Sequence, residues 1–94
     1  MSHETLLNEY KEDVKILIFD DEDHLDKIRR KGKMIIKNIS GEDSSDYRDF
    51  KSIGFHVNYH PADNDSKIRK WNEGQQKIIN LIDTMIEELS LFGK

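Results

Sequence analysis

Two short stretches of this acidic chain are rich in cationic side chains. The first stretch contains Lys27, Arg29, Arg30, Lys31, Lys33 and Lys37, and the second contains Lys67, Arg69 and Lys70. Guanidinium and ammonium groups bind phosphate oxygens, and a nearby ring such as that of Tyr10 or Trp71 can stack on a base. If the two stretches meet, they predict a binding site for a small anionic ligand. The alternative is that they are solvated helix faces balanced by nearby acids.

Two histidines are also spaced in a way that metal ligands could be. His56 and His60 lie four apart, so both side chains would face the same way on a helix or on a straight strand. Asp63, His24 or His3 would be needed as a third metal ligand. Because Pro61 follows and polar residues alternate with apolar ones here, we expect an exposed polar face and no structural metal site.

A short acidic run follows an apolar segment near the N-terminus. The sequence Lys15-Ile16-Leu17-Ile18-Phe19-Asp20-Asp21-Glu22 resembles the opening of a response-regulator receiver domain, where paired acids bind magnesium. The resemblance covers only residues 15–22, and no later apolar strand ends in a phosphoacceptor aspartate. The run is therefore interpreted as the acidic start of a helix.

Composition narrows the class of protein. The chain of 94 residues predicts a single domain, 1–94, and its 35 % hydrophobic content is above that of disordered chains. No run approaches the ~20 apolar residues of a membrane span, and the residues Met1 to Glu4 do not resemble a signal peptide. The net charge of −4 argues against a general nucleic-acid binder. Without cysteine, a nucleophile turn or a glycine-rich phosphate loop, we expect no enzyme, no cofactor and a cytoplasmic setting.

The last third of the chain has the strongest helical pattern. A seam of residues alternates three and four apart, and all but Gln75 are apolar: Ile68, Trp71, Gln75, Ile78, Ile82, Met85, Leu89 and Phe92. The helix should start near Asp65 or Ser66 and end near Phe92, so its roughly 25 residues would span about 38 Å. Because that length matches or exceeds a domain of this size, we expect a homo-oligomer whose interface includes Ile78, Ile82, Met85 and Leu89.

A second helix is predicted around residues 25–39. Leu25, Ile28, Gly32, Ile35 and Ile39 repeat the same spacing, acids crowd its start, and lysines occupy its later turns. Gly32 costs ~1 kcal/mol of helix propensity relative to alanine, which a close helix crossing or a large neighbour such as Trp71 would explain.

The remaining segments are less regular. Residues 4–19 favour a helix, although 14–19 also fit a short buried strand. A short helix is expected around Tyr47 and Phe50, and residues 55–60 alternate as a brief strand or extended loop would. The sequence therefore predicts a mainly α fold, a small helical hairpin or bundle with a long C-terminal amphipathic helix.

One family resembles this arrangement. A short cysteine-free chain of helices that ends in a long amphipathic helix is similar to the phage anti-CBASS sponge proteins, which are small, oligomeric and sequester cyclic nucleotide signals without hydrolysing them. The resemblance implies a stacking role for Tyr10, a phosphate-binding lysine among residues 27–33, and a contribution from Lys70-Trp71. It also implies a role in evading antiviral defence in a host cytoplasm.

Two functions are therefore predicted, and both are non-enzymatic. The first is sequestration of a phosphate-bearing nucleotide at an interface between protomers. Antiparallel packing of the two predicted helices would bring the two basic stretches together to bind it. The second is a protein–protein interaction module, such as an antitoxin, immunity protein or phage inhibitor. That module would present Asp20, Asp21, Glu22, Asp23 and Asp26 to a basic partner.

Overall fold

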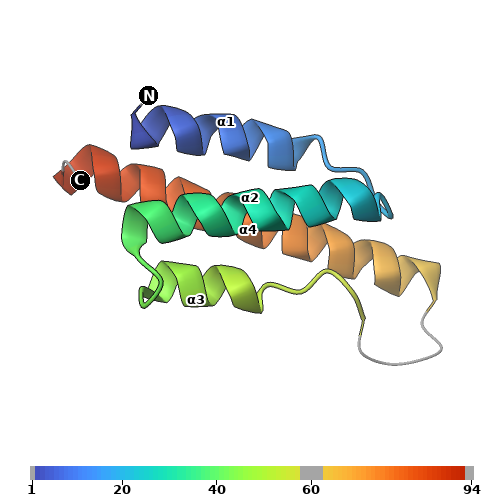
Figure 1. Cartoon of the computed structure of the whole chain (residues 1–94). Helices are drawn as coiled ribbons and strands as arrows, with labels where there is room; N and C mark the ends of the chain where they lie inside the picture. The colour runs from blue at the N-terminus through green and yellow to red at the C-terminus, as the bar shows by residue number, and fades with distance from the viewer. Residues whose placement is uncertain (1, 58–62, 93–94) are drawn as a thin grey trace.

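The computed structural model describes residues 2–57 and 63–92, and all of its regular structure is helical (Figure 1). The helices are α1 (His3–Lys15), α2 (Glu22–Ser40), α3 (Ser45–Ser52) and α4 (Asn64–Phe92). Within these two ranges no residue belongs to a strand, so the predicted mainly helical fold is confirmed. None of the described helices has a stretch apolar enough to cross a membrane.

Each helix begins at a side-chain cap. The side-chain oxygens of Ser2, Asp21, Ser44 and Asp63 each accept a hydrogen bond, at 2.7–3.2 Å, from the backbone amide three residues ahead. Hydrogen bonds from Ser66 hold the pKa of the Asp63 carboxyl below its usual value. The long helix therefore starts slightly earlier than predicted, because Asp63 and not Asp65 or Ser66 supplies the cap.

The N-terminal helix is shorter than the predicted range of 4–19. It ends at Lys15, and residues 16–21 form a tight turn in which Asp20 has a left-handed φ of 72°. The amide of Asp21 donates to the Ile18 carbonyl at 3.1 Å, which closes this turn. Residues 16–19 are thus neither helix nor strand. Residues 53–57 are also outside regular structure, and 58–60 of the second suggested strand lie outside the described residues.

Consecutive helices run in opposite directions, so α2 and α4 point the same way (Figure 1). Two contacts show that α1 and α4 are antiparallel. Lys11 of α1 pairs with Asp83 of α4 at 2.6 Å, whereas the carbonyl of Val14, further along α1, accepts a hydrogen bond from Gln75, which comes before Asp83 in α4. The molecule is 46 Å long, and α4 at ~1.5 Å per residue extends along nearly all of that axis.

The core lies between α1, α2 and α4 and is closed on one side by α3 and residues 53–57. Its buried side chains are Leu7, Tyr10, Val14, Leu17, Leu25, Ile28, Ile35, Ile36, Phe50, Phe55, Trp71, Ile78, Ile82 and Met85. Gly32 lets Phe50 of α3 and Tyr10 of α1 lie directly against α2, because a Cβ there would overlap Phe50 Cζ and Tyr10 Oη. The predicted need for a large neighbour is confirmed, but that neighbour is not Trp71.

Trp71 joins three separate segments of the chain. Its ring makes edge-on contacts with Phe19 of the α1–α2 turn at 5.7 Å and with Phe55 at 5.4 Å between centroids. Phe55 fits against α4 only because residue 74 is glycine, since a Cβ there would lie 2.6 Å from the Gly54 carbonyl oxygen. Glycine at this position therefore allows the backbone of residues 53–57 to pack directly on α4.

Gln75 ties the end of α1 to the middle of α4. Its Nε2 donates to the carbonyl oxygens of Val14 at 2.8 Å, Leu17 at 3.2 Å and Lys15 at 3.3 Å. These carbonyls belong to the last turn of α1 and the residues that follow, where intrahelical donors are missing. Gln75, the polar member of the predicted seam, is thus a capping residue for another helix.

We predict that Gln75→Ala lowers the free energy of unfolding by about 1–2 kcal/mol, because it removes the side-chain donor that the carbonyls of Val14, Lys15 and Leu17 share. Gln76→Ala is the matched control, since Gln76 is exposed and bonds only to Asn80 of its own helix; it should change stability by less than ~0.5 kcal/mol. Urea unfolding followed by circular dichroism measures both. Equal losses in the two variants would contradict the capping role.

Candidate functional site

The two aromatic rings predicted to stack on a ligand are both in the core. Tyr10 is 0 % exposed and Trp71 is 1 % exposed. A nucleobase cannot reach either ring without opening the bundle. The predicted stacking role of Tyr10 and Trp71 is therefore wrong for this fold, and the reason is that their apolar area is needed to complete a small core.

Tyr10 also has its polar atom occupied. Its hydroxyl donates to the Ile28 carbonyl oxygen at 2.7 Å across the α1–α2 contact. Burial raises the pKa of this phenol well above its usual value, the negative charge of Asp13 adds to the effect, and Arg29 opposes it. The residue thus links two helices as a neutral hydrogen-bond donor.

The basic stretches do not combine as predicted, because α2 and α4 run in the same direction and not antiparallel (Figure 1). Arg29 is drawn into the structure: its guanidinium donates to the Ile53 carbonyl at 2.8 Å and lies 5.2 Å from the Phe55 ring centroid. Lys70 approaches the same segment from α4, with its Nζ 4.0 Å from the position of a Cβ built on Gly54. Arg29 is therefore a structural residue that fastens residues 53–55 to α2.

The other predicted cations of α2 face solvent. Arg30 pairs with Asp26 of the preceding turn at 3.0 Å, and Lys31 and Lys33 are exposed on the same helix. Exposed ion pairs of this kind contribute little to stability. Arg30, Lys31 and Lys33 line neither of the two pockets described below.

The cations of α4 border a shallow depression of about 360 Å³. Arg69 and Lys70 line it with Ser66, Val57 and Glu73, while Lys67 is exposed nearby. Lys77, hydrogen-bonded to Glu73, and then Lys70 hold the pKa of the Glu73 carboxyl below its usual value, so this carboxyl is charged at neutral pH. Its negative charge offsets part of the attraction that Arg69 and Lys70 exert on an anion.

The residues predicted to form an oligomer interface pack inside the single chain. Ile78, Ile82 and Met85 are at most 2 % exposed, and Leu89 is half-buried against the same core. The seam of α4 packs against α1 and into the core of the same chain, so Ile78, Ile82 and Met85 cannot form the predicted interface in this fold. Self-association remains a prediction that light scattering tests, and it would require other side chains.

His24 and His56 each form a hydrogen bond with a carboxylate, and no metal cluster forms among the described residues. His56 Nε2 lies 3.0 Å from a Glu22 carboxylate oxygen, and His24 Nε2 lies 3.2 Å from Asp13. In the described part of the chain no three histidine or acidic side chains come together as metal ligands. His60 lies outside the described residues, so the predicted absence of a metal site at the His56/His60 pair stays a prediction.

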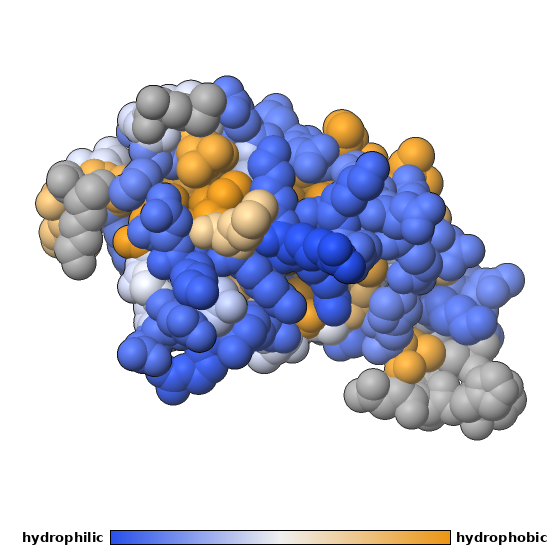
Figure 2. Space-filling model, in the orientation of Figure 1, coloured by the Kyte–Doolittle hydropathy of each residue, from blue (hydrophilic) through white to orange (hydrophobic). Residues whose placement is uncertain are grey.

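The α1–α2 turn exposes apolar side chains that the sequence reasoning did not single out. Ile16 is 67 % exposed and Ile18 is 70 % exposed. The alternate residues Leu17 and Phe19 turn inward and pack against the core. The exposed hydrophobic areas in Figure 2 are separate from one another on a mostly hydrophilic face. The spacing of Leu7, Tyr10, Val14 and Leu17 could have revealed the exposure of Ile16, since it leaves that residue off the apolar stripe.

Comparisons with known proteins add no relative. No protein-family model, no curated protein and no solved structure matches the chain. Function is therefore argued from the geometry of the exposed surfaces alone.

We predict that stability falls above pH ~10, where the phenol of an unfolded chain ionises while the buried Tyr10 phenol resists ionisation. The contribution is fully present below that pH and is lost as the pH rises. Tyr10→Phe should cost about 1 kcal/mol at neutral pH through the lost hydrogen bond and should reduce the alkaline slope. Urea unfolding at several pH values measures the slope, with Tyr47→Phe as the control that should retain it.

Proposed function

We propose that this chain is a non-enzymatic binding module that docks a basic protein partner on its α1–α2 turn. The observation that carries the proposal is the exposure of Ile16 and Ile18 beside a run of carboxylates that begins at Asp20. An exposed apolar pair with a charged border is typical of a protein-interaction surface, where apolar anchors supply affinity and charges supply specificity.

The turn presents these isoleucines on a rigid support. Leu17 and Phe19 anchor the turn in the core, and Phe19 does so by packing on the Trp71 ring. The Leu17 amide also donates to the Val14 carbonyl at 3.1 Å. A partner that binds here does not first have to order the turn, which lowers the entropic cost of association. The left-handed backbone of Asp20 further restricts the conformation.

The charges around the turn are available to a partner. Asp20 and Asp23 are exposed, and within the described residues neither forms an ion pair. Asp21 caps α2, whereas Glu22 and Asp26 have exposed partners in His56 and Arg30. Two free carboxylates beside two free isoleucines favour a partner segment with lysine or arginine next to an apolar side chain.

We predict that a display library of random peptides selected on this protein becomes enriched in peptides that combine basic and apolar residues. Ile16→Ser with Ile18→Ser should weaken binding of such a peptide by roughly tenfold or more, as expected when interface anchors are removed. The measurement is fluorescence anisotropy of a labelled selected peptide.

Met34→Ser is the matched control, because Met34 is 66 % exposed but lies in α2 among lysines and arginines. It should leave binding unchanged. Enrichment of acidic peptides, or binding that survives the isoleucine changes, would contradict docking at the turn. Light scattering of the free protein reports whether the occupant is instead a second copy of the chain.

The second candidate is sequestration of a phosphate-bearing nucleotide, and the depression beside Arg69 and Lys70 is the observation that favours it. The Ser66 hydroxyl and two cations would bind phosphate oxygens there. Without an accessible ring of Tyr10 or Trp71, such a site would recognise the phosphates more than the base.

We predict for this candidate that calorimetric titration with cyclic mono- and dinucleotides gives measurable heat, and that Arg69→Glu weakens binding by roughly ten- to a hundredfold. Lys33→Glu, which changes the same charge on α2, should have a much smaller effect. The nucleotide should be recovered intact after denaturation of the protein. No heat at millimolar nucleotide would exclude the candidate and leave docking of a protein partner.

A further inference from the structure

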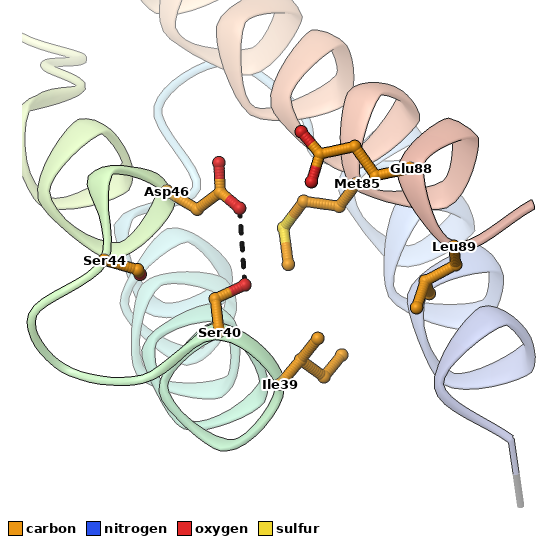
Figure 3. Close-up of a pocket in the computed structure, with 7 residues that line it drawn as sticks. All are labelled: Ile39, Ser40, Ser44, Asp46, Met85, Glu88 and Leu89. Atoms are coloured by element: carbon orange, nitrogen blue, oxygen red, sulfur yellow. Dashed lines mark hydrogen bonds between the residues drawn. The ribbon is translucent and has the colours of Figure 1, made fainter. Parts of the chain in front are cut away.

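A pocket of about 270 Å³ lies where the C-terminal ends of α2 and α4 meet the N-terminal end of α3 (Figure 3). Its apolar lining comes from α2 and α4, and its polar lining comes from all three helices. The apolar residues are Ile39, Met85 and Leu89, and the polar residues are Ser40, Ser44, Asp46 and Glu88. The volume suits a short chain-like group and is just under the ~300 Å³ lower bound of pockets for drug-sized ligands.

The polar side of the pocket is negative. Asp46 and Glu88 reach toward one another from α3 and α4 in Figure 3. Within the described part of the chain, neither carboxylate forms an ion pair. Asp46 accepts a hydrogen bond from the Ser40 hydroxyl at 3.3 Å, which leaves further acceptor capacity on the carboxylate.

The helix ends make the electrostatic potential in the pocket more negative. Ile39 and Ser40 are the last residues of α2, so the negative end of its dipole is at the pocket, and the last turn of α4 contains no basic residue. Lys37, the nearest basic residue in the sequence of α2, pairs with Glu42 at 3.5 Å. The positive N-terminal end of α3 acts in the opposite sense, but the Ser44 cap and Asp46 in its first turn offset it.

We infer that this pocket binds an alkylammonium group, either of a free aliphatic amine or of a lysine side chain. The ammonium would donate to Asp46 and Glu88, and the alkyl chain would lie on Met85 and Leu89. Methionine adapts to irregular apolar groups, which fits such a chain. The apolar lining and the presence of only two carboxylates disfavour a hydrated metal ion, which requires more oxygen ligands.

This site is separate from the docking surface proposed above. The α1–α2 turn is at the opposite end of the molecule from the last turns of α2 and α4 (Figure 1). The inference therefore does not depend on the proposed function, and either can fail without the other.

The test is a titration of the isotope-labelled protein with hexylamine, followed by two-dimensional NMR. Amide signals of residues 39–46 and 85–89 should shift, and hexanol, the neutral counterpart of the same length, should bind at least about tenfold more weakly because it forms no charge-assisted hydrogen bond. Titration with N-acetyl-lysine amide distinguishes the sources: stronger binding than hexylamine indicates a lysine side chain, and weaker binding indicates a free amine.

Glu88→Gln should weaken hexylamine binding by roughly tenfold, and the exposed neighbour Glu87→Gln is the control that should not. Asp46→Asn is a second variant, with circular dichroism as the check that α3 remains folded. Equal affinity for hexanol and hexylamine, shifts confined to other residues, or an unchanged affinity in Glu88→Gln would overturn the inference.

Discussion

The contact of Trp71 with two segments that are distant in the sequence is the interaction on which the rest of the structure depends. Phe19, Phe55 and His56 all meet its ring edge-on, at centroid distances of 5.4–6.0 Å, and they come from the α1–α2 turn and from the segment after α3. The indole N–H has no acceptor among the described residues, which costs about 1–3 kcal/mol. Burial of a tryptophan side chain contributes about 3–5 kcal/mol, so the packing outweighs the unpaired donor.

Both proposed binding surfaces follow from that contact. Because Phe19 is held on Trp71, the turn that contains it is fixed and its neighbour Ile18 faces solvent. Phe55 packs on the same ring, which keeps the segment after α3 on the core, and α3 itself packs against α2. The first turn of α3 then lies beside the end of α4, and the pocket forms between them. The bundle thus has an apolar and acidic surface at one end and an acidic pocket at the other.

Much of the helical content could be predicted, because it is local. The 3–4 spacing of apolar residues and the acidic start of α2 placed that helix and α4 within a few residues of their observed bounds. The end of α1 was misplaced because its last turn is closed by Gln75, a residue far away in the sequence. The candidate site was mostly missed for a related reason: Tyr10, Trp71 and Arg29 have ordinary ligand-binding chemistry. Only the burial of the two rings and the hydrogen bond from Arg29 to the Ile53 carbonyl show that they are structural.

The sequence by itself determined the class of the fold, since helix periodicity, caps and the polarity of charges are properties of neighbouring residues. Only the tertiary structure decided which way α2 and α4 run relative to one another, and therefore which cations and carboxylates meet. It also decided that the seam of α4 is covered by the chain's own helices and not by a partner. The physical reason is that a small domain has to bury nearly all of its large apolar side chains, and the spacing of a seam does not specify which surface will cover it.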